Sequence, residues 1–143
     1  MRDLARIREL AAFFRTAIEL CDRKRLPITF KEFPLGSCGD AAILLGTFLK
    51  EEGAGTFTYM VGQRGEGNDR HSHAWLEDDG VIVDITADQF LDMTERVIVT
   101  THSCWHKTFD QEKMHEADYR IFDKHTVATL GNAYKTILGG VVR

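Results

Sequence analysis

Residues 33–40 read Phe-Pro-Leu-Gly-Ser-Cys-Gly-Asp and come directly before a long apolar segment. Proline and glycine interrupt regular structure, and Ser37 followed three residues later by Asp40 has the form of a capping box. Apolar residues then recur at helical spacing as far as Gly53, a residue type that commonly ends helices. The pattern predicts a buried helix whose first residue is Cys38.

Cys38 would occupy a position that activates a thiol. The positive end of the helix dipole lowers the pKa of a cysteine in the first turn and so favours the reactive thiolate. The free backbone N–H of Cys38 can join an oxyanion hole, and Gly39 is expected to leave room for a substrate. We therefore predict that Cys38 is a nucleophile, which requires a base and a group that orients the base.

Both partners are found in a predicted β-hairpin. Residues 71–77 alternate as a half-buried strand should, and residues 81–85 are rich in β-branched side chains. The Asp-Gly step at 79–80 predicts a tight turn between them. A two-residue turn places His73 diagonal to Asp84 on one face of the hairpin, whereas a four-residue loop places them directly opposite. In either register, His73 can serve as the base and Asp84 as the group that orients it.

Three short motifs resemble those of a known superfamily. Gly-Ser-Cys-Gly at 36–39 is similar to the tetrad around the nucleophile of papain. His-Ala-Trp-Leu-Glu at 73–77 and Val-Asp-Ile-Thr at 83–86 are similar to the His and Asp strands of bacterial transglutaminase-like domains. In this order, the motifs resemble the papain-like/transglutaminase-like superfamily of cysteine enzymes, over residues 33–90 or about 40% of the chain.

The resemblance implies an α+β fold in which the nucleophile helix packs on an antiparallel β-sheet, with Cys38, His73 and Asp84 as the catalytic triad. It also implies a cysteine amide hydrolase, of the peptidase or protein-glutamine deamidase type, that acts on a protein or peptide through a thioester. Transglutaminase acyl transfer to an amine is one alternative. The other is a catalytically inactive fold that serves as a protein-binding module, which Glu32 favours because papain-type enzymes carry the oxyanion-hole glutamine at that position.

A competing metal site involves His102, Cys104 and His106. In an extended segment these side chains would share one face and could bind a metal together with His71 or His73. Zinc sites with alternating ligands this close in sequence are uncommon, and no cysteine pair supports one. We therefore predict no metal at these residues, which would instead line the rim of a groove or pack under Trp105. No cofactor is predicted either, because the glycines of residues 62–70 are not followed by a phosphate-binding helix start.

The remaining segments are expected to frame this site. Gln89, in a short turn or helix at 86–90, could supply a hydrogen bond near the site, but we predict a surface or structural amide. The patterns predict a helix over 3–22, a strand over 56–61, a polar loop over 62–70, a strand over 96–100, an irregular or loosely helical segment over 107–118, a last strand over 119–122, and a final helix capped by Thr126 and ended by Gly139-Gly140.

Composition limits the class of protein. The length of 143 residues fits a single domain over residues 1–143. A net charge of −4 gives no electrostatic basis for binding nucleic acid or an anionic membrane. No apolar run is long enough to span a bilayer, no signal peptide is recognisable, and three scattered cysteines favour a reducing compartment. We expect a cytoplasmic protein, with export as an effector that lacks a signal peptide as the alternative.

Overall fold

A computed structural model describes residues 2–139 of the chain. Short 3₁₀ turns connect its main elements, among them η4 (Ala87–Gln89), η5 (His106–Thr108) and η6 (Tyr119–Ile121). The helices and strands are α1 (Leu4–Leu20), α2 (Cys38–Glu51), β1 (Thr58–Arg64), β2 (His71–Asp78), β3 (Val81–Asp84), β4 (Ile98–Thr100), β5 (Asp110–Glu116) and α3 (Lys124–Gly139).

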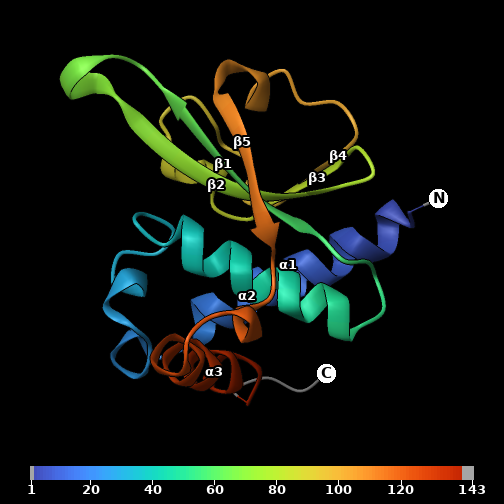
Figure 1. Cartoon of the computed structure of the whole chain (residues 1–143), viewed down its shortest axis with the longest axis vertical. Coiled ribbons are helices and arrows are strands. Elements are labelled where there is room, and N and C mark those ends of the chain that lie inside the picture. The colour runs from blue at the N-terminus through green and yellow to red at the C-terminus, as the bar shows by residue number, and fades with distance from the viewer. Residues whose placement is uncertain (1, 140–143) are drawn as a thin grey trace.

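The strands form one sheet in the order β4-β3-β2-β1-β5, and every neighbouring pair is antiparallel. The three helices lie together below this sheet in Figure 1, and β1 and β2 extend beyond the other strands as a long hairpin. The expected α+β class, with a helix that starts at Cys38 packed on an antiparallel sheet, is confirmed.

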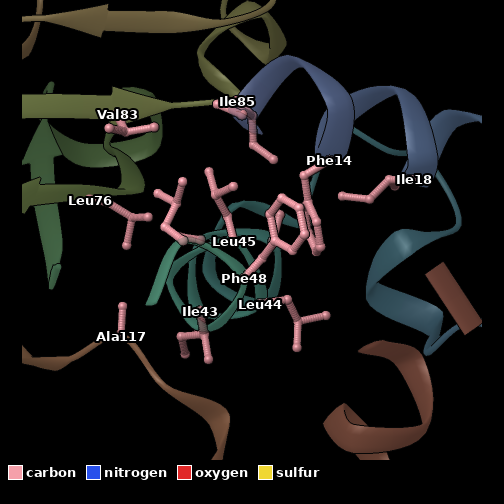
Figure 2. Close-up of a cluster of buried hydrophobic side chains, with 14 of the residues drawn as sticks. Phe14, Ile18, Ile43, Leu44, Leu45, Phe48, Leu76, Val83, Ile85 and Ala117 are labelled. Carbon is pink, nitrogen blue, oxygen red and sulfur yellow. The ribbon is translucent and has the colours of Figure 1, made fainter. Parts of the chain in front are cut away.

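Helix α2 is the centre of the core because it packs against β1 and β2 as well as against α1 and α3. Every residue of 41–49 is buried, so this helix is apolar on all sides rather than along one stripe. Figure 2 shows Leu45 and Phe48 on the side of α2 that faces the sheet and α1, and Leu44 on the side that faces α3. The first turn of α2 is thereby held by the main core.

A second apolar cluster covers the other face of the sheet. Met60, Trp75 and Phe109 form its buried part, with Phe90 and Trp105 packed against them. Successive residues of a strand point to opposite faces, so Trp75 lies on this side while the neighbouring Leu76 faces the helices. His73 is two residues from Trp75 and belongs to the same side of β2.

Several predicted boundaries differ from the structure. Residues 107–118, for which the sequence predicts an irregular or helical segment, contain β5, which pairs with β1 along its length. Residues 119–122 form the turn η6 instead of a strand. Strand β1 continues to Arg64, into the predicted loop, because it stays paired with β2.

The ends of the two outer helices are set by aspartates. Asp3 caps α1, since its carboxylate accepts from the backbone N–H of Arg6 at 3.1 Å. Asp123, rather than Thr126, holds the start of α3, because its carboxylate accepts from the Thr126 N–H at 2.8 Å. The predicted stop at Gly139-Gly140 lies partly outside the described residues, which end at position 139 within α3. No helix in residues 2–139 combines the length and apolar character needed to cross a membrane.

Candidate active site

Cys38 is the first residue of α2, as the sequence predicts. The expected capping box is not formed. The Ser37 hydroxyl instead donates to the carbonyl of Pro34 at 3.1 Å, and the Asp40 carboxylate accepts from the hydroxyl of Thr29 at 2.6 Å. The first N–H groups of any helix lack partners within it, so the positive end of the α2 dipole lies beside the Cys38 thiol.

The β2–β3 hairpin brings the other two predicted residues together. The turn residues 79–80 both have positive φ, 49° and 79°, as the tight turn predicted from the Asp-Gly step requires. Leu76 pairs with Val83, which is the register of a two-residue turn and places His73 diagonal to Asp84. Of the two registers considered from the sequence, this is the one that forms.

The hydrogen bond between His73 and Asp84 is completely buried, since both side chains have 0% exposure. His73 Nε2 lies 2.7 Å from Asp84 Oδ2, and the backbone N–H of Thr86 donates to Asp84 Oδ1 at 3.0 Å. Burial alone would raise the pKa of Asp84, but the charge of His73 and the hydrogen bonds from His106 and His73 hold this pKa well below its usual range. Asp84 is therefore an anion next to an imidazole.

The pKa values of Cys38 and His73 shift in opposite directions. Burial raises the pKa of Cys38, but the hydrogen bond and charge of His73, the Ala74 backbone N–H and the Gln89 amide together lower it below its usual value. Burial lowers the pKa of His73, but Asp84 and then Cys38 raise it to about 9. These shifts favour a thiolate–imidazolium pair at neutral pH.

Gln89 belongs to the site, which its sequence context does not indicate. It lies on η4, directly after the hairpin, and its side-chain Nε2 is 3.2 Å from His73 Nδ1. The same amide is among the groups that lower the pKa of Cys38, so it lies near the thiol and is neither a surface group nor a remote structural one. Glu32, at the position of the papain glutamine, is exposed. The amide beside the thiol thus comes from a segment after Asp84, and no periodic pattern marks it.

His106 is a second histidine on Asp84. Its Nε2 lies 2.7 Å from Asp84 Oδ2, and its Nδ1 lies 2.5 Å from the Ser103 hydroxyl. His102 and Cys104 are exposed, whereas His106 is fully buried. The competing metal site is not assembled, because the chain turns into η5 and does not run extended through these residues.

His73, Asp84 and His106 are the side chains in residues 2–139 that lie close enough to one another to share a metal ion. Each histidine Nε2 is only 2.7 Å from the same carboxylate oxygen. Zinc bonds of about 2.0–2.2 Å in a tetrahedral site keep ligand atoms more than about 3 Å apart. The spacing in this cluster is that of direct hydrogen bonds.

Aromatic side chains form a wall around the imidazole of His73. The rings of Phe90 and Trp105 meet it edge-on, with centroids 5.1 Å and 5.7 Å away. Behind them, the Arg64 guanidinium lies 5.1 Å from the centroids of both aromatic rings and pairs with Asp92 at 2.7 Å. Polar interactions are stronger in such an apolar environment, so the wall strengthens the hydrogen bonds of His73.

An open groove of about 380 Å³ adjoins the site. Gln89 and Phe90 line it from η4, and His71 lines it from the start of β2. Two further lining residues, Leu35 and Leu91, are large apolar side chains exposed to solvent. Cys38 and His73 do not line this groove, which borders the site through Gln89.

Gly39 has a different role from the one expected. A Cβ atom at this position would come within 2.9 Å of the Tyr59 hydroxyl, so Gly39 makes room for Tyr59 and not for a substrate. Burial, followed by the charges of Cys38 and Asp40, raises the pKa of Tyr59 to about 12. The phenol therefore stays protonated near the first turn of α2.

We compared the chain with protein-family models, curated proteins and solved structures, and none of them matched it.

Proposed function

We propose that this protein is a cysteine amide hydrolase, of the peptidase or protein-glutamine deamidase type, with Cys38 as nucleophile, His73 as base and Asp84 as the residue that orients the base. The observation that carries the proposal is the buried 2.7 Å bond between His73 Nε2 and Asp84 Oδ2, next to a thiol in the first turn of a helix. A nucleophile, a base in contact with it and a third group on the base make up the arrangement that acyl transfer requires.

The proposal includes a papain-like/transglutaminase-like core. Its support is the order of the three residues along the chain and their placement on a central helix and two adjacent antiparallel strands. The short motifs that resemble the superfamily lie in these same elements. Asp84, where papain has asparagine, is closer to the transglutaminase and deamidase pattern.

In the first half of the reaction, the Cys38 thiolate attacks the carbonyl carbon of a carboxamide or peptide bond. The carbon–nitrogen bond then breaks, and His73 transfers its Nδ1 proton to the departing amine or ammonia. A thioester on Cys38 and a neutral imidazole remain. Asp84 fixes the position of the proton on Nε2 throughout and stabilises the imidazolium before transfer.

Two donors are placed to stabilise the oxyanion. The backbone N–H of Cys38 lies at the start of α2, where no partner within the helix competes for it. The Gln89 amide, whose Nε2 lies 3.2 Å from His73 Nδ1, can supply a second N–H from the opposite segment. Removal of one such donor typically reduces turnover by about 10²–10³-fold.

In the second half of the reaction, His73 accepts a proton from water while the water oxygen attacks the thioester. The acid product leaves, and the thiolate and imidazolium form again. The exposed groove lets water reach the site, which favours hydrolysis. An amine in place of water would give transglutaminase acyl transfer. The shallow, open shape of the groove suits a segment of protein or peptide as the acyl substrate.

The first test is the pH dependence of alkylation of Cys38 by iodoacetamide, followed by mass spectrometry. Exposed Cys104 serves as the reference thiol in the same molecule. We expect Cys38 to react at pH 6 at least about tenfold faster than Cys104, because a lowered pKa leaves more thiolate at that pH. The same measurement is made for His73→Ala and, as a control at an exposed histidine on α3, for His125→Ala.

His73→Ala should abolish the rapid reaction at pH 6, whereas His125→Ala should leave it unchanged. An activated thiol then justifies screening of peptides and protein glutamines, with ammonia or new N-termini as the product signals. If the alkylation of Cys38 has the same pH dependence as that of Cys104 and does not change in His73→Ala, the proposed triad is wrong. A protein-binding module is then the better account of this fold.

A further inference from the structure

Asp84 is shared by two histidines that approach the same oxygen atom. His73 Nε2 and His106 Nε2 each lie 2.7 Å from Oδ2, and both histidine side chains are completely buried. The second carboxylate oxygen, Oδ1, accepts from the backbone N–H of Thr86. Every oxygen of this buried anion is therefore used, and one of its three donors, His106, has no part in the reaction proposed above.

The hydrogen-bond pattern fixes the position of the proton on His106. A carboxylate can only accept, so the proton shared with Asp84 is on His106 Nε2. The other ring nitrogen, Nδ1, lies 2.5 Å from the Ser103 hydroxyl, which can donate to it. The backbone N–H of His106 donates to the same Ser103 oxygen at 3.1 Å. The Ser103 hydroxyl, the His106 ring and the Asp84 carboxylate thus form a chain of two hydrogen bonds, in which Asp84 is the final acceptor.

The His106 ring is held firmly from all sides. The rings of Trp75 and Trp105 pack against it with centroids 4.8 Å away. The Gln111 side chain donates to the His106 carbonyl at 2.7 Å, which ties η5 to the first residues of β5. Two reciprocal bonds with Ser103 and two aromatic contacts leave the ring no freedom to turn away from Asp84.

We propose that His106 is a positioning residue of this site, which, backed by the Ser103 hydroxyl, holds the Asp84 carboxylate in the orientation that bonds His73. This inference rests on the proposed function of Cys38 and His73. Arg64 and its partner Asp92 lie behind the aromatic wall, where the guanidinium is 5.1 Å from the centroid of Trp105.

The direct test is nuclear magnetic resonance of the histidine side chains in ¹⁵N-labelled protein near pH 7. We expect His106 to carry its proton on Nε2, protected from exchange, with Nδ1 as an acceptor. A proton on Nδ1, or stoichiometric binding of added Zn²⁺ that involves His106, would overturn the inference. Because this measurement needs no reactive thiol, it separates failure of the inference from failure of the proposed function.

The functional test uses His106→Leu, which removes the donor, and His106→Gln, which keeps an N–H for Asp84. Ser103→Ala removes the hydroxyl alone, and exposed His102→Leu is the matched control from the same segment. In His106→Leu, we expect the carboxylate to turn from His73, so that alkylation of Cys38 at pH 6 falls about tenfold, equivalent to one pKa unit. His106→Gln should recover most of the loss, and His102→Leu should show none.

The pH profile distinguishes positioning from mere packing. Loss of Asp84 alignment should move the rise of the alkylation profile to higher pH, because a less basic imidazole stabilises the Cys38 thiolate less. A His106→Leu variant that folds, by circular dichroism, and keeps the wild-type profile would contradict the proposal. If His106→Leu does not fold, an unchanged profile in Ser103→Ala together with a His106 proton on Nδ1 would contradict it equally.

Discussion

At the scale of single residues, each charged group of the site changes the pKa of the next one, from Asp84 to His73 to Cys38. Asp84 is the buried anion, and three hydrogen bonds stabilise it. Its charge opposes the effect of burial on His73 and raises the pKa of that imidazole to about 9. The imidazolium in turn lowers the pKa of Cys38. The thiolate therefore depends on a carboxylate that it does not touch, through one intermediate ring.

Asp84→Asn tests this dependence. Without the carboxylate charge, the pKa of His73 should fall from about 9 toward its ordinary value of 6.5. The imidazolium exists below its pKa, so the alkaline limit of the thiolate–imidazolium pair should move to lower pH by the same amount. A pH titration of the His73 ring by ¹⁵N nuclear magnetic resonance measures this limit, with Asp69→Asn, at an exposed residue between β1 and β2, as the control. An unmoved limit would show that Asp84 does not set the protonation of His73.

Cys38, His73 and Asp84 could be found from the sequence because each lies on an element with a clear pattern. Cys38 follows a Pro/Gly interruption and precedes an apolar helix, and the other two lie on a hairpin with a recognisable turn. Gln89 and His106 lie on the 3₁₀ turns η4 and η5, where no periodicity indicates which way a side chain points. Their positions follow from tertiary packing.

At the scale of elements, the β2–β3 hairpin determines the geometry of the base. Its turn has two residues in the left-handed region, and this length sets the register that puts His73 diagonal to Asp84. A shift of one residue would send His73 to the other face of β2. The conformation of a two-residue turn far from the thiol thus controls the hydrogen bond at the site.

Gly80→Ala should make this turn less stable. Gly80 has φ of 79°, and a Cβ atom added there would meet no other atom within 4 Å, so the cost is backbone strain and not a clash. We expect the free energy of unfolding to fall by about 1 kcal/mol. Urea denaturation measures the change, and Asp79→Asn is the control because asparagine tolerates positive φ. Equal stability of Gly80→Ala and wild type would mean that the turn does not have this conformation.

The pattern of β5 explains why the sequence does not predict this strand. Its residues, Asp-Gln-Glu-Lys-Met-His-Glu, show neither alternation nor β-branched side chains. It is a strand because β1 offers an unpaired edge, to which residues 110–116 bind. Because this pairing depends on the partner strand β1, the residues of β5 alone do not predict that they form a strand. The following residues 119–122 are more apolar but have no partner strand, and they form η6.

At the scale of the whole molecule, the first turn of α2 is held in place by a core that surrounds the rest of the helix. The sheet covers one side of α2, and α1 and α3 cover the others (Figure 1). Lys50, near its C-terminal end, pairs with Glu116 and Asp118 and so ties that end to the last strand. The position of Cys38 is therefore a property of the whole core.

Leu45→Ala should weaken the entire fold. The Leu45 side chain is 1% exposed and lies between α2 and the sheet (Figure 2), so its truncation leaves a cavity. We expect a loss of about 2–5 kcal/mol in the free energy of unfolding. Leu20→Ala, at a side chain that is 70% exposed, should cost far less. Chemical denaturation compares the two variants, and similar losses would contradict the proposed position of α2 at the centre of the core.

The polar strand β5 has a consequence for behaviour at high protein concentration. The ends of the sheet are β4, which has three residues, and β5, whose residues 110–114 are all exposed. An unpaired strand edge invites pairing with another chain, and short length or charged side chains oppose this. Both ends of the sheet have one of these protections. The polar residues of β5, which make this strand hard to predict from the sequence, thus also oppose pairing of the edge strands of two copies of this chain.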